Sequence, residues 1–314
     1  MKYILVFLGL MLGVAFAAEG DITPNQAADF FYHQFGDKAN PHKKVNHTKG
    51  FCVSGKFEAR KDIDEFVKIP LLEKNVRVLA RYSTGGGNPN ANDKTSAHGL
   101  ALRFTNGKEQ WDFATLNGVI NAGKTPSVIV KFLEVVGNPA KKKELEALIK
   151  EYPGVGRILE YNKTIGVPLS LANVQFNSQH VYGVLSPDGK ILHAKIIFVP
   201  QAGIIELSAK EAQKVGDNFL EERFLKDLRK NNVNYYMYLV LANPNDVIDD
   251  ISAPWENTNK KIFLGTLKLN KFKGDSCNLD VFLPGILPNG IQAPIDPVFE
   301  FRNQTYGITF QRRQ

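Results

Sequence analysis

The sequence predicts an α+β protein. Six segments are rich in valine, isoleucine, tyrosine and phenylalanine and partly alternate apolar with polar residues, which is typical of β-strands. Four other segments repeat their apolar residues at helical spacing. Helical segments are inserted between the strands, and no linker divides the chain into two halves. We therefore expect a single domain over residues 18–314.

Each expected element has a local reason. We expect helices at residues 24–35, 126–136, 139–152 and 208–230. The first three begin at a proline, which is favoured in the first helical turn, and the last begins at Ser208 with Glu211 in capping-box spacing. We expect strands at residues 76–81, 99–104, 174–185, 191–199, 234–241 and 262–270. Residues 186–189, Ser-Pro-Asp-Gly, supply the turn of a hairpin.

The N-terminus has the pattern of a signal peptide. Lys2 precedes an apolar run over residues 3–16, and the small residues Ala15 and Ala17 precede the acidic Glu19. We expect cleavage after Ala17 and export to the periplasm. The run is shorter than the roughly 20 residues that a transmembrane helix needs. No later segment is longer and equally apolar, so we expect no membrane span.

Charge and cysteine content narrow the classes of partner. The net charge is +7, but the lysines are spread along the chain rather than clustered with aromatic residues. We therefore expect no nucleic-acid partner. Cys52 and Cys277 would be exported together, so a disulfide is permitted, but the sequence does not say whether they meet. The small and apolar neighbours of Cys52 favour a buried packing residue.

Arg302 and Tyr306 suggest iron chemistry. They are four residues apart, so on a helix they share one face. A guanidinium beside a phenol favours the phenolate, which is a hard oxygen donor suited to ferric iron. An isolated tyrosine is more often an ordinary interfacial side chain. The interpretation as an iron ligand therefore depends on further motifs elsewhere in the sequence.

Further motifs precede this pair along the chain. They are His47-Thr-Lys-Gly50 with Gly55-Lys-Phe57 behind it, Arg81-Tyr-Ser-Thr84, Gly99-Leu-Ala-Leu-Arg-Phe104, Trp111-Asp-Phe113, and Pro288-Asn-Gly-Ile291 with Pro294-Ile-Asp296. Each is similar to a motif of the haem catalases, and all occur in the family's order, with Tyr306 ten residues after Asp296. The chain therefore resembles the catalase-related peroxidases, the small exported members of that superfamily.

The resemblance implies a fold and a cofactor. The fold is an antiparallel β-barrel with inserted helices and a C-terminal helix that carries the tyrosine. The cofactor is haem b, with Tyr306 on the iron and Arg302 stabilising the phenolate. Three basic residues match family positions that support the haem, namely Lys44, Arg81 and Arg313. Lys44 and Arg81 would serve as cations for the haem propionates. Arg313 is open to a second interpretation, as part of a solvated tail.

On the other side of the haem, the resemblance assigns acid–base chemistry to His47. One imidazole can take a proton from a bound peroxide and return it to the leaving oxygen, and Ser83 would fix its orientation. Two departures follow. Leu116 occupies the position of the family's peroxide-orienting asparagine, with Asn117 one residue later, and His98 replaces an arginine. These changes suggest a remodelled pocket, suited to bulkier peroxides, with Asn117 brought into place by a loop shift.

The implied activity is that of a haem peroxidase. It would reduce hydrogen peroxide or organic peroxides through two one-electron reductions by an organic donor. Three alternatives stay open: a true catalase, an isomerase of fatty-acid hydroperoxides, and a non-enzymatic haem-binding protein. The chain ends eight residues after Tyr306, so we expect no NADPH-binding surface and a more open haem pocket. The sequence does not decide between a monomer and a homo-oligomer.

Overall fold

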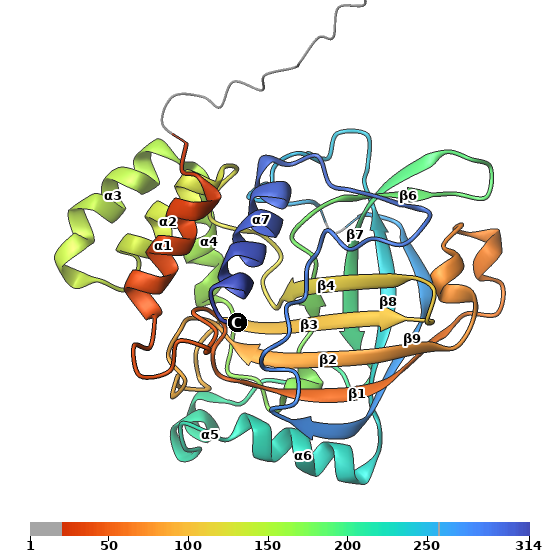
Figure 1. Cartoon of the computed structure of the whole chain (residues 1–314), viewed down its shortest axis with the longest axis horizontal. Coiled ribbons are helices and arrows are strands. Elements are labelled where there is room, and N and C mark those ends of the chain that lie inside the picture. Colours follow the sequence, from red (N-terminus) through yellow and green to blue (C-terminus); the bar gives the residue numbers. More distant parts are fainter. Residues whose placement is uncertain (1–20, 257) are drawn as a thin grey trace, which may run out of the picture.

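The computed structural model describes residues 21–256 and 258–314 (Figure 1). The expected signal peptide, residues 1–17, lies outside the described residues. The strands are β1 (Gly50–Ala59), β2 (Val76–Thr84), β3 (His98–Thr105), β4 (Gln110–Leu116), β5 (Phe176–Asn177), β6 (Tyr182–Leu185), β7 (Ile191–Pro200), β8 (Val233–Leu241), β9 (Lys261–Gly274) and β10 (Ile291–Gln292). The α-helices are α1 (Pro24–Phe35), α2 (Pro126–Val135), α3 (Lys142–Glu151), α4 (Pro153–Lys163), α5 (Ala209–Lys214), α6 (Leu220–Lys230) and α7 (Pro297–Gln311).

The strands form a closed barrel. Neighbours follow the order β7-β5-β4-β3-β2-β1-β9-β8, and β8 pairs with β7 to complete the ring. The strands β6 and β10 extend the sheet beyond β7. Every pairing is antiparallel. The predicted antiparallel barrel with inserted helices is confirmed.

Alternation along β2, β3 and β4 separates the core from the outer face. Every second residue of these strands belongs to the barrel core, where aromatic side chains pack edge to face or tilted. The ring of Phe104, for example, is fully buried and lies 5.1 Å from that of Phe113. The intervening residues of the same strands face outward. They include small and polar residues that a barrel core would not hold.

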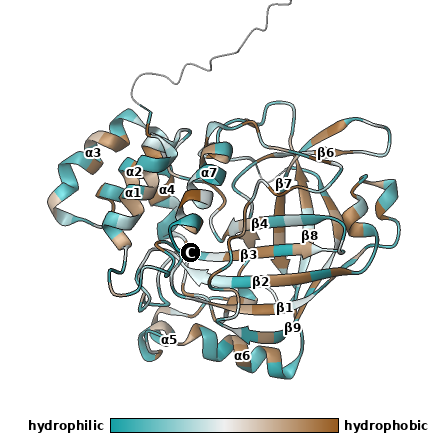
Figure 2. Ribbon diagram, in the orientation of Figure 1, coloured by the Kyte–Doolittle hydropathy of each residue, from teal (hydrophilic) through white to brown (hydrophobic). Residues whose placement is uncertain are grey.

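Helices cover part of this outer face. In Figure 1, α7 lies between the barrel and a layer of helices formed by α1 to α4. The apolar sides of α2, α3 and α4 form a second hydrophobic cluster. The hydroxyl of Tyr32 on α1 donates to the carbonyl of Thr309 on α7 at 3.2 Å, and Arg312 pairs with Asp29 at 2.7 Å. Figure 2 shows hydrophilic residues along α5 and α6, which lie below β1 and β9 in this view.

Several elements differ from those predicted. The helix at 24–35 is as expected, whereas the one at 208–230 is two helices, since Gly216 and Asp217 interrupt it after the predicted cap at Ser208. The strands β1 and β4 were not predicted. Charged Lys56 and Glu58 obscure the alternation in β1, and Asp112, fully buried in an ion pair, obscures it in β4. The helix α4 was also missed.

The two cysteines meet. Cys52 is fully buried, as expected, but it is bonded to Cys277 rather than serving as an unpaired packing residue. The favoured interpretation was therefore wrong in that respect, because 225 residues separate the partners and the sequence gives no sign of their proximity. Among the residues that the structure describes, no helix is long and apolar enough to cross a membrane.

The barrel core should dominate stability. Phe104→Ala removes a fully buried ring, so we expect the free energy of unfolding to fall by about 3–5 kcal/mol. The measurement is urea unfolding followed by circular dichroism. Phe263→Ala is the matched control: its ring lies on the outer face of β9 and is partly exposed, so the loss should be clearly smaller. Equal losses would show that the barrel interior is not the main core.

Candidate active site

The outer face of the barrel presents two rows of residues to α7. One row runs across four strands through Gly50, Ser83, Gly99 and Leu116, which are register partners. The next row runs through Cys52, Arg81, Ala101 and Ala114. Side chains at paired positions share a face of the sheet. Because Gly99, Ala101 and Ala114 carry little or no side chain, the helix and the sheet do not close the space between them.

Two adjoining cavities fill this space. The first lies against the two rows and α7. The second extends between α1, α2, α4 and α7 and is mainly apolar. Both are lined by His47, Leu116, Arg302 and Tyr306, so these residues mark the boundary between them.

His47 is held firmly in the loop before β1. Its φ of 52° is uncommon for a residue other than glycine. Asn46 stabilises this conformation by accepting the His47 amide at 2.9 Å, and Arg81 donates to its carbonyl at 2.8 Å. The Nδ1 atom lies 3.0 Å from the hydroxyl of Ser83. A side chain at Gly99 would contact that hydroxyl and the imidazole, so glycine is required beside them.

Burial also keeps the imidazole of His47 neutral. Desolvation, aided by Arg81 and Arg302, lowers the pKa of His47 to about 3. Since Nδ1 is engaged by Ser83, Nε2 is the nitrogen available for a ligand in the cavity. The predicted pairing of His47 with Ser83 is present, and at neutral pH the ring is uncharged.

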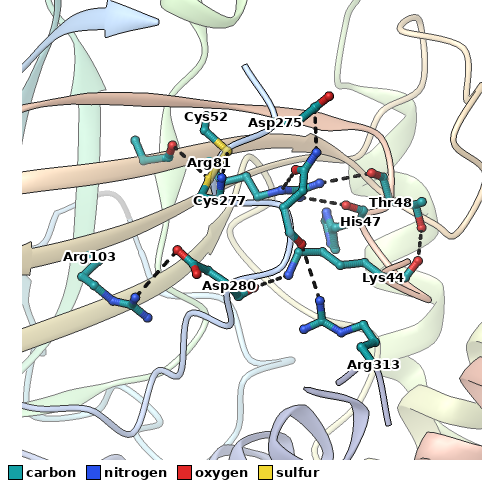
Figure 3. The surroundings of a disulfide bond; sticks show 12 residues. Lys44, His47, Thr48, Cys52, Arg81, Arg103, Asp275, Cys277, Asp280 and Arg313 are labelled. Atoms are coloured by element: carbon teal, nitrogen blue, oxygen red, sulfur yellow. Dashed lines mark hydrogen bonds and ion pairs between the residues drawn. A yellow bond between two sulfur atoms is a disulfide. The ribbon is translucent and has the colours of Figure 1, made fainter. Parts of the chain in front are cut away.

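Three basic side chains gather at one end of the first cavity. They are Lys44, Arg81 and Arg313, and Figure 3 shows them near Asp280 and the Cys52–Cys277 disulfide. Burial, with Arg313 and Arg81 nearby, lowers the pKa of Lys44 to about 6, and burial lowers that of Arg81 to about 10. Arg313 is 4% exposed, so the interpretation as a solvated tail is wrong. Clustered cations of this kind favour an anionic ligand.

A chain of hydrogen bonds supports Tyr306. Arg302 donates from Nε to the tyrosine hydroxyl at 2.9 Å and from a terminal nitrogen to Nε2 of His180 at 3.2 Å. Because arginine can only donate, His180 accepts there and carries its proton on Nδ1, 2.8 Å from Asp296. Asp296 also caps α7 by accepting the amides of residues 298 and 299. Asp296 thus caps the start of α7 and also orients the hydrogen-bond chain that runs through His180 and Arg302 to Tyr306.

Sequence reasoning missed His180. No motif surrounded it, and it was grouped with the other histidines as an ordinary residue. Asp296 was quoted only as a landmark, although an aspartate followed by Pro297 is a typical start of a helix. That signal would have placed the start of α7, but nothing local connects His180 to it, since 116 residues separate the two.

Asn117 shares only the second cavity with His47, Arg302 and Tyr306. It lines the second cavity but not the first. Its side-chain oxygen accepts the amide of His98 at 3.0 Å, and its nitrogen donates to the carbonyl of Ser96 at 2.7 Å. One amide proton remains for a ligand, so its role in orienting peroxide stays a prediction. His98 is buried away from both cavities and does not join the cations.

The low pKa of His47 makes stability depend on pH. An unfolded histidine binds a proton below about pH 6.5, whereas folded His47 does not until about pH 3. Stability is therefore lost as pH falls through this window. In the haem-free protein, we expect His47→Gln to reduce the loss between pH 7 and pH 5 by up to about 2 kcal/mol.

Urea unfolding at the two pH values measures this loss. His33→Gln is the control, because His33 is exposed on α1 and its replacement should leave the pH dependence unchanged. If His47→Gln unfolds with the wild-type pH dependence, His47 is not held neutral by its surroundings.

Known proteins share this arrangement of elements. A family model described as Catalase matches residues 32–314. Catalase-related peroxidases from Synechococcus elongatus and Mycolicibacterium paratuberculosis are similar, at 27% and 25% identity over 96% and 94% of this chain and 91% and 96% of their own lengths. A catalase from Listeria seeligeri is 23% identical over 88% of this chain, which spans only 62% of that protein.

Solved structures agree with the sequence match. Catalase A from Saccharomyces cerevisiae superimposes with a TM-score of 0.77 at 18% identity, covering 86% of this chain and 61% of that one. A fungal catalase gives a TM-score of 0.76 at 19% identity, with 86% and 59% covered. At such identities the likeness shows the fold alone. Together with the family match over most of the sequence, it establishes that this chain belongs to the catalase family.

Proposed function

We propose that the protein is a haem-dependent peroxidase that reduces hydrogen peroxide or organic peroxides with electrons from an organic donor. One observation carries the proposal. A single cavity is lined by a neutral imidazole held by Ser83 and by a tyrosine hydroxyl held by Arg302. An acid–base group and an anionic oxygen ligand are thus available to one bound cofactor.

The residues around the cavity fit haem b. Among the described residues, no salt bridge joins Lys44, Arg81 or Arg313 to a carboxylate, so these three cations are free for the two propionates. The small side chains of Ala101 and Ala114 leave room for a flat macrocycle. Tyr306 would bind the iron. When bound, haem supplies the redox chemistry that splits the peroxide bond.

The protein itself would move the proton. His47 is neutral at physiological pH because of its low pKa, so Nε2 can take the proton of an incoming hydroperoxide. The imidazolium then returns that proton to the departing oxygen, which leaves as water or an alcohol. On the other side, Arg302 stabilises the phenolate of Tyr306, while His180 and Asp296 fix the guanidinium.

Leu116 supports organic peroxides as substrates. Leu116 pairs with Gly99 in the row next to that of Arg81. Its apolar side chain lines both cavities. It offers no hydrogen bond to orient hydrogen peroxide. The second cavity continues the apolar surface with Ile129, Phe132 and Ile158. True catalase activity is the alternative, favoured by the similarity to proteins named catalase.

We further propose that the protein works in the periplasm. The Cys52–Cys277 disulfide supports this location, because disulfides persist in oxidising compartments and are rare in the cytosol. The proposed leader over residues 1–17 would direct the export.

The proposal is tested by the optical spectrum and by peroxide kinetics of the reconstituted protein. We expect a Soret band typical of tyrosinate-bound ferric haem that changes on addition of one equivalent of cumene hydroperoxide. His47→Ala should keep the band but slow the change by a factor of about 100 or more, because the acid–base group is lost.

His33→Ala, an exposed histidine on α1, is the matched control and should react at the wild-type rate. A band that peroxide does not alter would favour haem carriage over catalysis. Absence of a haem band after reconstitution would contradict the whole proposal.

Leu116→Asn tests the choice between peroxidase and catalase. A side-chain amide at this outward position would give hydrogen peroxide a hydrogen-bond partner beside His47. We therefore expect more oxygen to be evolved per molecule of donor oxidised. An oxygen electrode and a chromogenic phenol measure the two products. Leu116→Met keeps the site apolar and should leave the ratio unchanged; an unchanged ratio in Leu116→Asn would mean that Leu116 does not set the preference.

A further inference from the structure

A single segment crosses the outer face of the barrel beside the cations. Residues 275–287, here called the strap, connect β9 toward β10 and pass over β1 to β4 (Figure 1). Cys277 is bonded to Cys52 on β1, and Asn278 contacts Arg81 on β2. The carbonyl of Val281 then accepts from Arg103 on β3. The strap thus meets successive strands in order.

The far end of the strap is fixed by a buried carboxylate. Asp112 on β4 is fully buried and pairs with Arg103 at 2.9 Å. Its other contacts include the amide of Leu283 at 3.1 Å, and its own amide donates to the carbonyl of Ile286. The strap is therefore anchored at both ends, by the disulfide at residue 277 and, from residue 281 onward, by hydrogen bonds to the ion-paired residues Arg103 and Asp112.

Residues 278–280, between the two anchors, orient all three cations (Figure 3). The side-chain oxygen of Asn278 accepts from Nε of Arg81 at 2.8 Å. The carbonyl of Asp280 accepts from the ammonium of Lys44, and the carbonyls of residues 278 and 279 accept from Arg313 at 3.5 and 3.4 Å. These acceptors are uncharged, and the carboxylate of Asp280 lies 4.0 Å from Arg103 rather than in a salt bridge with the cluster.

We propose that the Cys52–Cys277 disulfide is a positioning element for the anion-binding cluster of Lys44, Arg81 and Arg313. The inference rests on the proposed function, in which this cluster binds the haem propionates. The guanidiniums of Arg81 and Arg313 repel each other, and this repulsion must be resisted before the anions arrive. Lys44, whose pKa burial lowers to about 6, regains its charge when an anion binds beside it. Because the acceptors begin one residue after Cys277, the bond to β1 holds them where the cations meet the cavity.

A disulfide can also stabilise a protein simply by restricting its unfolded state. That role does not depend on the charge of the ligand, whereas positioning of the cluster does. Haem dimethyl ester separates the two, because its propionates are neutral esters while its macrocycle and iron are those of haem. Equilibrium titration of the Soret band gives the affinity for each ligand.

We expect Cys52→Ala/Cys277→Ala to weaken binding of haem about tenfold or more relative to wild type. Its affinity for the dimethyl ester should change less than about twofold, since the cluster contributes little to a neutral ligand. Equal loss for both ligands, or no loss for either, would overturn the proposal, because the bond would then act only on overall stability or not at all.

A second variant keeps the test decisive if the double variant does not fold. Asn278→Ala leaves the disulfide intact and removes the acceptor of Arg81, so haem should again lose affinity selectively. Leu279→Ala is the matched control, because its side chain is 61% exposed and only its carbonyl contacts Arg313. Equal behaviour of Asn278→Ala toward both ligands would contradict the inference. Wild-type protein that binds neither ligand would instead contradict the proposed function.

Discussion

The arrangement of the site depends on one guanidinium. Arg302 donates to the hydroxyl of Tyr306 on its own helix, to the carbonyl of Ala114 on β4 and to the imidazole of His180. It therefore fixes α7 against the barrel and sets the direction of the tyrosine in the same set of contacts. Among the described residues it has no carboxylate partner of its own, so its charge acts on the phenol. Arg302 therefore contributes both to the packing of α7 against the barrel and to the electrostatic environment of Tyr306.

The rest of the site follows from strand alternation. A strand that fills a barrel with aromatic residues on one face has its other face available, and here that face carries glycine, alanine and arginine in matching rows. The small residues leave room for the first cavity, and the polar residues supply its hydrogen-bonding and charged groups. The helices and the strap then close it from outside. The outer face of the barrel thus forms one wall of the cavity. The interior of the barrel is filled by the hydrophobic core and does not hold the cavity.

The sequence predicted what is local and missed what is distant. The pairing of Arg302 with Tyr306 could be foreseen from helical spacing alone, and motif order identified His47 and Ser83, which the structure brings to 3.0 Å. The disulfide could not be foreseen, because its partners lie on different elements far apart in the chain. His180 was missed for the same reason, and β4 was missed because a buried, paired aspartate reads as a loop residue.

The contact between α1 and α7 has a consequence for how the protein matures. Tyr32 and Thr309 are separated by 277 residues, and both helices line the cavities. During synthesis α1 emerges long before α7, so the pocket cannot form until α7 has been made. An interrupted chain would lack both the pocket wall and the tyrosine. Only a chain that includes both α1 and α7 can therefore form the cavities.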